Sequence, residues 1–236
     1  TTVYARATGC LLARKVDPGD LRVINLIPGG ADSPTHPKRS RAFDLFDGLD
    51  EHAVEKWMRA VLADPDALTA QARERVDFVV PAVVRLVVSW CNQTLERLLP
   101  SYLGRATTRG GLKAHASRQG NVGHLAQQLY ALAWGEQAEP LIAQTLTEIH
   151  DYLKPLWTDY AHVFNSGEPE IGLKSVFRTP CFVLVLAPDM KRSPASFRLL
   201  TRSITVSLQL AIGQQPADEQ AKLLVVLDGF QHCLTP

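Results

Sequence analysis

The residues best suited to do chemistry stand near the end of the chain, in the stretch Lys222-Leu223-Leu224-Val225-Val226-Leu227-Asp228-Gly229-Phe230. Five apolar residues run into Asp228, which indicates a buried strand that ends in a carboxylate. Nucleotide-hydrolysing ATPases place the acidic ligand of their Mg²⁺ at such a position. The pattern therefore predicts Asp228 as a Mg²⁺ ligand, reached through water, in a nucleotide-binding site. The alternative is a loop aspartate that caps a turn before Gly229.

The other parts of a hydrolytic site are missing from the sequence. In such ATPases the residue after the carboxylate is usually a glutamate that orients the attacking water, and here it is Gly229. The chain also has no G-x-x-x-x-G-K-[ST] loop, whose backbone N–H groups cradle the phosphates. We therefore expect no catalytic residue at position 229, poor nucleotide binding and no measurable ATP hydrolysis.

The composition is that of an ordinary globular protein. The 236 residues are 46% hydrophobic and 21% charged, a length that suits one large or two small domains. The 25 basic and 24 acidic residues give a formal net charge of +1, which argues against a strongly nucleic-acid-binding domain. The net charge does not exclude a local basic patch. Arg105, Arg109, Lys113 and Arg118, interleaved with glycine, either contact phosphates or belong to a solvated loop.

The cysteines and histidines do not show the spacing of metal ligands. Four cysteines lie far apart, which indicates reduced, buried thiols in a cytosolic setting: Cys10, Cys91, Cys181 and Cys233. His124, His150 and His162 lack the spacing of metal ligands, so we expect core or surface side chains. The apolar run from Phe78 to Trp90 is shorter than the ~20 residues of a membrane span and predicts a buried helix. No signal peptide is visible at the start of the chain.

The first two thirds of the chain are predicted to form a short strand followed by helices. Leu21–Ile27 predicts a strand, and Asp50 predicts the cap of a helix whose apolar residues recur every three or four positions. A long helical segment over 66–103 is expected to be interrupted near Pro81 and Pro100. The glycine-rich stretch 104–123 predicts a flexible connection. Two further helices are expected near residues 124–134 and 140–160.

The last part of the chain returns to a β-α-β pattern. Cys181–Ala187 is a run of seven apolar residues, typical of a strand buried on both faces. Ser193-Pro194 predicts the start of a helix, and a right-handed crossover would make the strand at 222–228 parallel to the first. We therefore expect an α/β protein with three parts: residues 1–45 and 161–236 form the α/β core, and residues 46–160 form an all-α inserted domain.

Four stretches, in this order along the chain, resemble the type IV coupling ATPases. These are the TraG/TraD-like proteins of conjugation and, more closely, the DotL/IcmO-like proteins of type IVB secretion systems. Asp20–Gly30 resembles the family's strand and turn, and Asp159–Phe164 continues the likeness. Phe182–Pro194 is similar to a long strand that ends in a Lys-Ser-Pro segment. Leu224–Phe230 matches the family's ILDEY motif except for glycine in place of glutamate.

The resemblance implies a RecA-like parallel-sheet NTPase core interrupted by the all-α domain. It also implies a hexamer at the cytoplasmic face of the bacterial inner membrane, with ATP and Mg²⁺ as cofactors. The implied partners are secretion-system subunits and secreted protein or DNA–relaxase substrates, which the helical domain contacts. In the family the phosphate loop and membrane helices come before the region that aligns with Thr1, so the chain is expected to be an internal segment. Only Asp228 carries over as a nucleotide-site residue.

Two other interpretations remain at this point. One is a non-hydrolysing module that binds partners or serves as a scaffold through its helical domain. The other is an unrelated α/β enzyme whose chemistry the motifs do not reveal. Pairing of the strand near residue 21 with the strand at 222–228 would favour the coupling ATPase over the unrelated enzyme.

Overall fold

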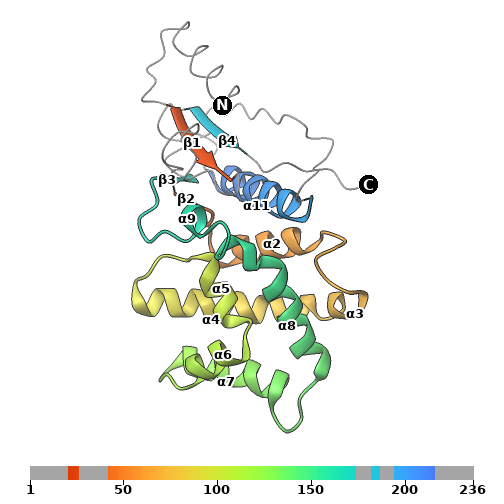
Figure 1. The fold of residues 1–236 in the computed structure, drawn as a ribbon. Helices are drawn as coiled ribbons and strands as arrows, with labels where there is room; N and C mark the ends of the chain where they lie inside the picture. The colour runs from red at the N-terminus through yellow and green to blue at the C-terminus, as the bar shows by residue number, and fades with distance from the viewer. Residues whose placement is uncertain (1–20, 27–41, 174–181, 187–193, 216–236) are drawn as a thin grey trace, which may run out of the picture.

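The computed structural model of the chain describes residues 21–26, 42–173, 182–186 and 194–215 (Figure 1). The strands are β1 (Leu21–Asn25), β2 (Phe43–Asp44), β3 (Ile171–Gly172) and β4 (Phe182–Leu186). The helices are α2 (Glu51–Leu62), α3 (Ala70–Arg73), α4 (Val76–Thr94), α5 (Pro100–Ala106), α6 (Arg109–Ala116), α7 (Asn121–Trp134), α8 (Pro140–Leu153), the 3-10 helix η2 (Lys154–Leu156), α9 (Ala161–Phe164) and α11 (Pro194–Gly213).

The strands form two small parallel sheets. β1 pairs with β4, so that Leu21 lies opposite Phe182, and β2 pairs with β3, so that Phe43 lies opposite Ile171. The strands predicted at 21–27 and 181–187 are thus confirmed over most of their length. Val185 is 37% exposed, so the prediction that the second strand is buried on both faces is wrong at this position. The strand predicted at 222–228 lies outside the described residues.

The predicted RecA-like parallel-sheet core interrupted by an all-α inserted domain is wrong. The described part of the chain is mostly helical, and each sheet within it has only two strands. The error has a physical origin. An apolar run indicates a strand, but it does not say how many neighbouring strands will join it in a sheet. The helices between residues 51 and 164 bury most of the core instead.

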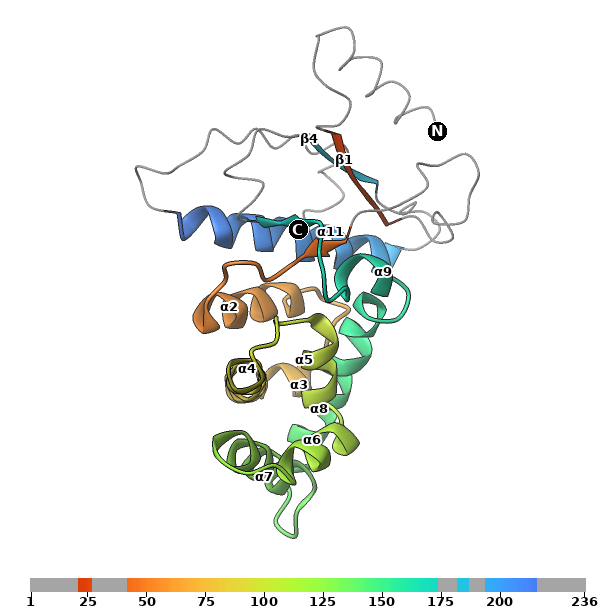
Figure 2. The same cartoon turned by 90° about the vertical axis from the view of Figure 1, so that its left-hand side faces the viewer.

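Helices α2 to α9, which we call the helical body, begin and end next to each other. The backbone N–H groups of Glu170 and Ile171 both donate to the carbonyl oxygen of Ala42, at 3.1 and 3.0 Å. The short β2–β3 pair therefore closes the helical body where the chain enters and leaves it. In Figure 2, where α4 is seen end-on, α2 lies on one side of α4 and α6 and α7 lie on the other.

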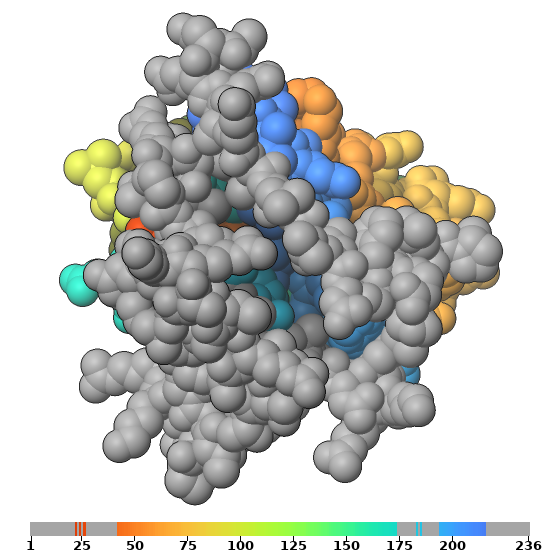
Figure 3. All heavy atoms as spheres, turned by 90° about the horizontal axis from the view of Figure 1, so that it is seen from above, coloured from red at the N-terminus to blue at the C-terminus, as the bar shows by residue number. Residues whose placement is uncertain are grey.

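Helix α2 joins the helical body to α11. Asp50 caps it, because its Oδ1 accepts a hydrogen bond from the Ala53 N–H at 2.7 Å, as the sequence predicted. Its apolar stripe is fully buried, with Trp57 and Met58 both 0% exposed. The indole N–H of Trp57 donates to the Ser203 carbonyl oxygen at 3.0 Å. Figure 3 shows α11 beside α2 from above.

Helix α4 runs through the helical body without a break at Pro81. Proline removes the N–H that would bond to the carbonyl of Asp77. That carbonyl instead accepts a hydrogen bond from Arg59 Nη2 at 3.3 Å. The prediction of an interruption near Pro81 is therefore wrong. The predicted break near Pro100 is confirmed, since α4 ends at Thr94 and α5 begins with Pro100.

Helix α4 is also the one helix in the described ranges that is long and apolar enough to cross a membrane, judged by length and composition. Core helices of other proteins meet the same criterion. The predicted buried helix is confirmed at most apolar positions: Val79, Val80, Val83 and Val84 are each 0% exposed. They lie between α2, α7 and α8.

The stretch 104–123 is helical, so the predicted flexible connection is wrong. It contains the end of α5, all of α6 and the start of α7. Its glycines allow close packing. A Cβ on Gly104 would lie 2.5 Å from the indole ring of Trp157, and a Cβ on Gly111 or Gly123 would collide with a backbone carbonyl. Glycine is needed at these positions because there is no room for a side chain.

Candidate functional site: a groove between α4 and α7

A surface groove lies between helices α4 and α7. It has a volume of about 310 Å³. The residues that line it are Asp77, Phe78, Pro81, Ala82, Arg85, Leu125, Gln128, Leu129 and Leu132. The two helices run antiparallel, because Phe78 meets Leu132 at one end and Ser89 is hydrogen-bonded to Asn121 at 3.1 Å near the other.

The groove exists because small side chains stand between large ones. Pro81 and Ala82 occupy the middle of the α4 wall, between the long side chains of Phe78 and Arg85. Leu129, at 2% exposed, forms the floor on the α7 side. The helices therefore pack closely below the groove while the surface above stays open.

Two large apolar side chains at the end of the groove are exposed to solvent. Phe78 is 48% exposed and Leu132 is 40% exposed. A single exposed apolar residue is common and needs no explanation. Here two of them from different helices border the same hollow, and adjoining exposed apolar groups with a polar rim are a feature of protein interaction sites.

The polar rim of the groove consists of exposed ion pairs. Asp77 pairs with Arg59, and its own side chain is 90% exposed. Arg85 pairs with Glu51 at 3.7 Å, with the two side chains 63% and 48% exposed. Exposed pairs of this kind contribute roughly 0–1 kcal/mol to stability. A ligand can therefore replace either partner at little cost to the fold.

A second group of residues lies beyond the Ser89–Asn121 end of α4. Trp90 packs against Tyr102 and His115, with ring centroids 4.3 and 4.8 Å away. The guanidinium carbons of Arg105 and Arg118 lie 6.0 and 5.5 Å from the Trp90 ring, within range of a cation–π interaction. We call these five residues the arginine–aromatic cluster.

The inner side chains of the cluster have unused hydrogen-bonding atoms. Trp90 Nε1 and His115 Nδ1 are buried and have no hydrogen-bond partner among the described residues. Trp90 is 4% exposed and His115 is 5% exposed. Burial lowers the pKa of His115 below its usual 6.5, and the nearby charges of Arg118 and Arg105 lower it further.

Ordinary structural roles account for other titratable groups near this region. Cys91 is a free, buried thiol whose pKa is raised to about 11 by burial and by the charge of Glu96. His150 Nδ1 lies 3.2 Å from the Gly104 carbonyl oxygen, so it links α8 to α5. Within the described ranges no three His, Cys, Asp or Glu side chains are arranged to hold a metal ion.

The residues that the sequence singled out are only partly brought together. Asp228 and Gly229, the predicted nucleotide and Mg²⁺ position, lie outside the described residues. Arg105 and Arg118 meet at Trp90, whereas Arg109 turns to the Tyr130 hydroxyl, 3.5 Å from its Nε. The predicted solvated loop is therefore wrong, because Arg109 and Lys113 lie in α6 and Arg105 lies in α5.

The groove was not predicted from the sequence, although the sequence contains one signal of it. On α4 the buried positions recur at helical spacing through Val79, Val83 and Leu86. Phe78 stands outside that stripe, and a large apolar residue on the polar side of a helix is worth noting. Its neighbour Leu132 lies 54 positions away, and only the fold brings the two together.

No family model matches the chain, and no characterised protein matches it in a sequence comparison.

Proposed function

We propose that the chain recruits a protein partner through the groove between α4 and α7. The observation that carries the proposal is the pairing of exposed Phe78 and Leu132 over a hollow of about 310 Å³. A groove between two helices, apolar at its floor and charged at its rim, suits an amphipathic helix whose apolar face enters it. This makes the helical body a partner-binding module.

The resemblance to type IV coupling proteins supplies the biological setting of this proposal. The chain would then act as a segment of a secretion or conjugation coupling protein. Its helical body would receive secreted protein or DNA–relaxase substrates, or secretion-system subunits, at the inner membrane. Recruitment needs no nucleotide chemistry from this segment, so Gly229 in place of a glutamate is compatible with it.

The test is a transfer assay in the strain that encodes the full-length protein. Phe78→Glu and Leu132→Glu each place a charge where a partner would bury an apolar side chain, which costs several kcal/mol. We expect each variant to lower conjugative or effector transfer by at least about tenfold. Purified variants should keep the helical content of the unchanged protein, since both positions already contact water.

Leu95→Glu is the matched control. Leu95 is also a large exposed apolar residue, at 93%, but it does not line the groove. This variant should transfer at the normal level. Transfer that is normal in both groove variants, or equally reduced in Leu95→Glu, would rule out the groove as the recruiting surface. Comparing mobilised DNA with a translocated reporter protein then separates the two kinds of cargo.

A further inference from the structure

The arginine–aromatic cluster carries two guanidinium groups, and neither forms an ion pair with a carboxylate in the described part of the chain. Their side chains, Arg105 and Arg118, are both exposed. The carboxylate of Glu96 is instead hydrogen-bonded to Tyr102, and burial together with this hydrogen bond raises the pKa of Tyr102. Two guanidinium groups thus lie near the indole ring of Trp90, and no carboxylate among the described residues pairs with either of them.

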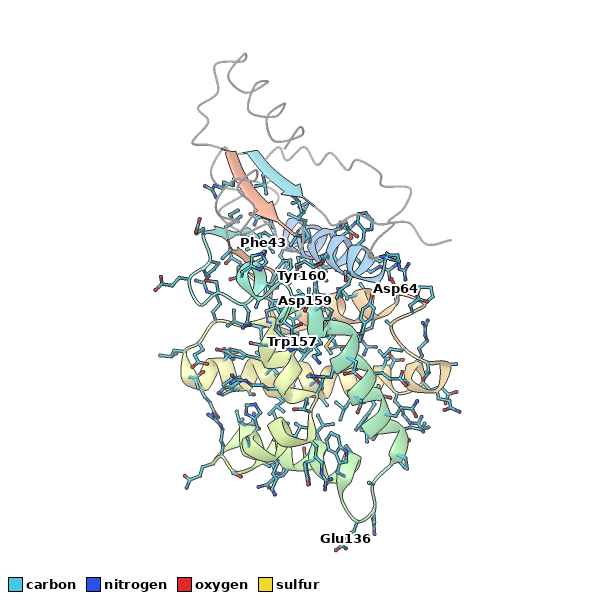
Figure 4. All side chains as sticks on the ribbon, in the orientation of Figure 1. Phe43, Asp64, Glu136, Trp157, Asp159 and Tyr160 are labelled. Atoms are coloured by element: carbon cyan, nitrogen blue, oxygen red, sulfur yellow. The ribbon has the colours of Figure 1, made fainter. Side chains whose placement is uncertain are left out.

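The sequence around the cluster also has an excess of positive charge. From Arg97 to Gly135 the chain has five Lys or Arg residues and no Asp or Glu, although the whole chain is nearly balanced at 25 to 24. Only Arg97 among these five forms an ion pair in the described structure, with Asp44. The next acidic residue is Glu136, which lies at the far tip of the helical body (Figure 4).

The atoms of the cluster that have no hydrogen-bond partner can donate hydrogen bonds to an anion. Trp90 Nε1 can only donate a hydrogen bond, and His115 Nδ1 donates in one neutral tautomer and in the protonated ring. Both guanidinium groups also only donate. A buried donor without an acceptor costs about 1–3 kcal/mol, so these donors favour a ligand that supplies oxygen lone pairs. The two arginine side chains are exposed, so a ligand reaches them from solvent.

We propose that the arginine–aromatic cluster binds a carboxylate of the protein partner that docks in the groove between α4 and α7. This inference rests on the proposed function, whose partner it describes: an amphipathic helix with an acidic end. Phe78 and Trp90 are 12 positions apart on α4, so the apolar and acidic contacts of the partner lie about 18 Å apart. About three helical turns span that distance.

A carboxylate fits these observations better than a nucleic-acid phosphate. Bases bind exposed aromatic faces, whereas Trp90 is only 4% exposed. Phosphate backbones need a row of cations, and the cluster offers two guanidinium groups at one point. The adjoining groove is apolar, which suits a protein side chain.

The test uses the whole chain labelled with ¹⁵N and acetate as the probe. The indole N–H signal of Trp90, assigned with Trp90→Phe, should shift and saturate as acetate replaces chloride at constant ionic strength. Arg105→Gln and Arg118→Gln should each weaken acetate binding about tenfold, because each removes one charge-assisted hydrogen bond. Arg109→Gln is the control and should leave the affinity unchanged, since Arg109 turns to Tyr130.

Inorganic phosphate, titrated in the same way, separates the two sources of negative charge. Saturation by acetate at lower concentration than phosphate supports the carboxylate site. Tighter binding of phosphate overturns it in favour of a nucleic-acid contact, and no saturable shift with either anion overturns it altogether. Acetate reaches the cluster without the groove, so Phe78→Glu should not change its affinity. Failure of the carboxylate site is therefore distinguishable from failure of the groove.

Discussion

Arg198 on α11 and Asp64 after α2 form an ion pair, with Nε and Oδ2 3.1 Å apart. The Asp64 side chain is 1% exposed and that of Arg198 is 25% exposed. Figure 4 shows Asp64 at the end of α2 that faces α11. Arg198 also pairs with Asp66, so one guanidinium holds both acidic groups of the turn. The helical body is thereby attached to the helix that follows β4.

Replacing Arg198 with alanine should destabilise the protein by about 3 kcal/mol, because it removes the ion pair that the guanidinium forms with the buried Asp64 carboxylate. Denaturant unfolding followed by circular dichroism measures the change. Arg75→Ala is the matched control: Arg75 pairs with Glu139 on the surface, and its loss should cost less than about 1 kcal/mol. Adding Asp64→Asn to Arg198→Ala should recover part of the loss. Equal costs for Arg198→Ala and Arg75→Ala would refute the anchoring role.

Gly104→Ala should destabilise the protein by about 1–3 kcal/mol, since the new methyl group would lie 2.5 Å from the rigid Trp157 ring. Gly110→Ala, in α6 of the same glycine-rich stretch, meets no atom within 4 Å. That change should stabilise by about 0.5–1 kcal/mol through helix propensity. Thermal unfolding measures both changes. If Gly104→Ala lowers the unfolding temperature and Gly110→Ala raises it, the stretch is packed. A flexible connection would instead give two changes near zero.

The sequence predicted the local features of this fold better than the relationships between distant residues. The cap at Asp50 and the apolar stripe of α2 depend on neighbours within a few positions, and both are as expected. Pro81 is tolerated because Arg59, from another helix, bonds to the freed carbonyl of Asp77. No pattern among neighbouring residues predicts this hydrogen bond between two helices.

The same limit applies to the candidate site. The basic residues near Arg105 and Arg118 were visible in the sequence, but their glycine neighbours favoured a loop. The contact of Gly104 with Trp157 shows why that interpretation failed: glycine also marks places where elements approach closely. The groove joins side chains that no periodicity connects. Sequence motifs pointed instead to Asp228, outside the described residues.

Leu95→Gly should stabilise the protein by about 1 kcal/mol. Leu95 ends α4 in the left-handed conformation, with φ of 56°, where a side chain clashes with its own backbone. It is 93% exposed, so little packing is lost with the side chain. Leu95→Ala removes the same packing and keeps the strain, so it should give no such gain. Chemical denaturation measures the free energy of unfolding of the unchanged protein and the two variants. If the Leu95→Ala variant is at least as stable as the Leu95→Gly variant, the backbone at Leu95 is not strained.

The stability of the protein should fall more steeply below pH 6.5 than that of a His115→Gln variant. His115 is 5% exposed, and burial together with Arg118 and Arg105 lowers its pKa in the folded state. Between that lowered pKa and 6.5 the unfolded chain binds a proton that the folded chain does not. Acid therefore favours unfolding in this window, while the contribution is fully present above pH 6.5.

The measurement is the free energy of unfolding of both proteins at half-unit steps from pH 8 to pH 4.5. All other groups titrate alike in the two, so the difference between the curves isolates His115. The difference should be constant above pH 6.5 and then shrink as the pH falls, because only the protein with His115 loses stability through this group. Saturating acetate should oppose that loss, since a bound carboxylate favours the protonated ring. A difference that grows towards low pH would show that the folded state stabilises the charged form, and would contradict the burial argument.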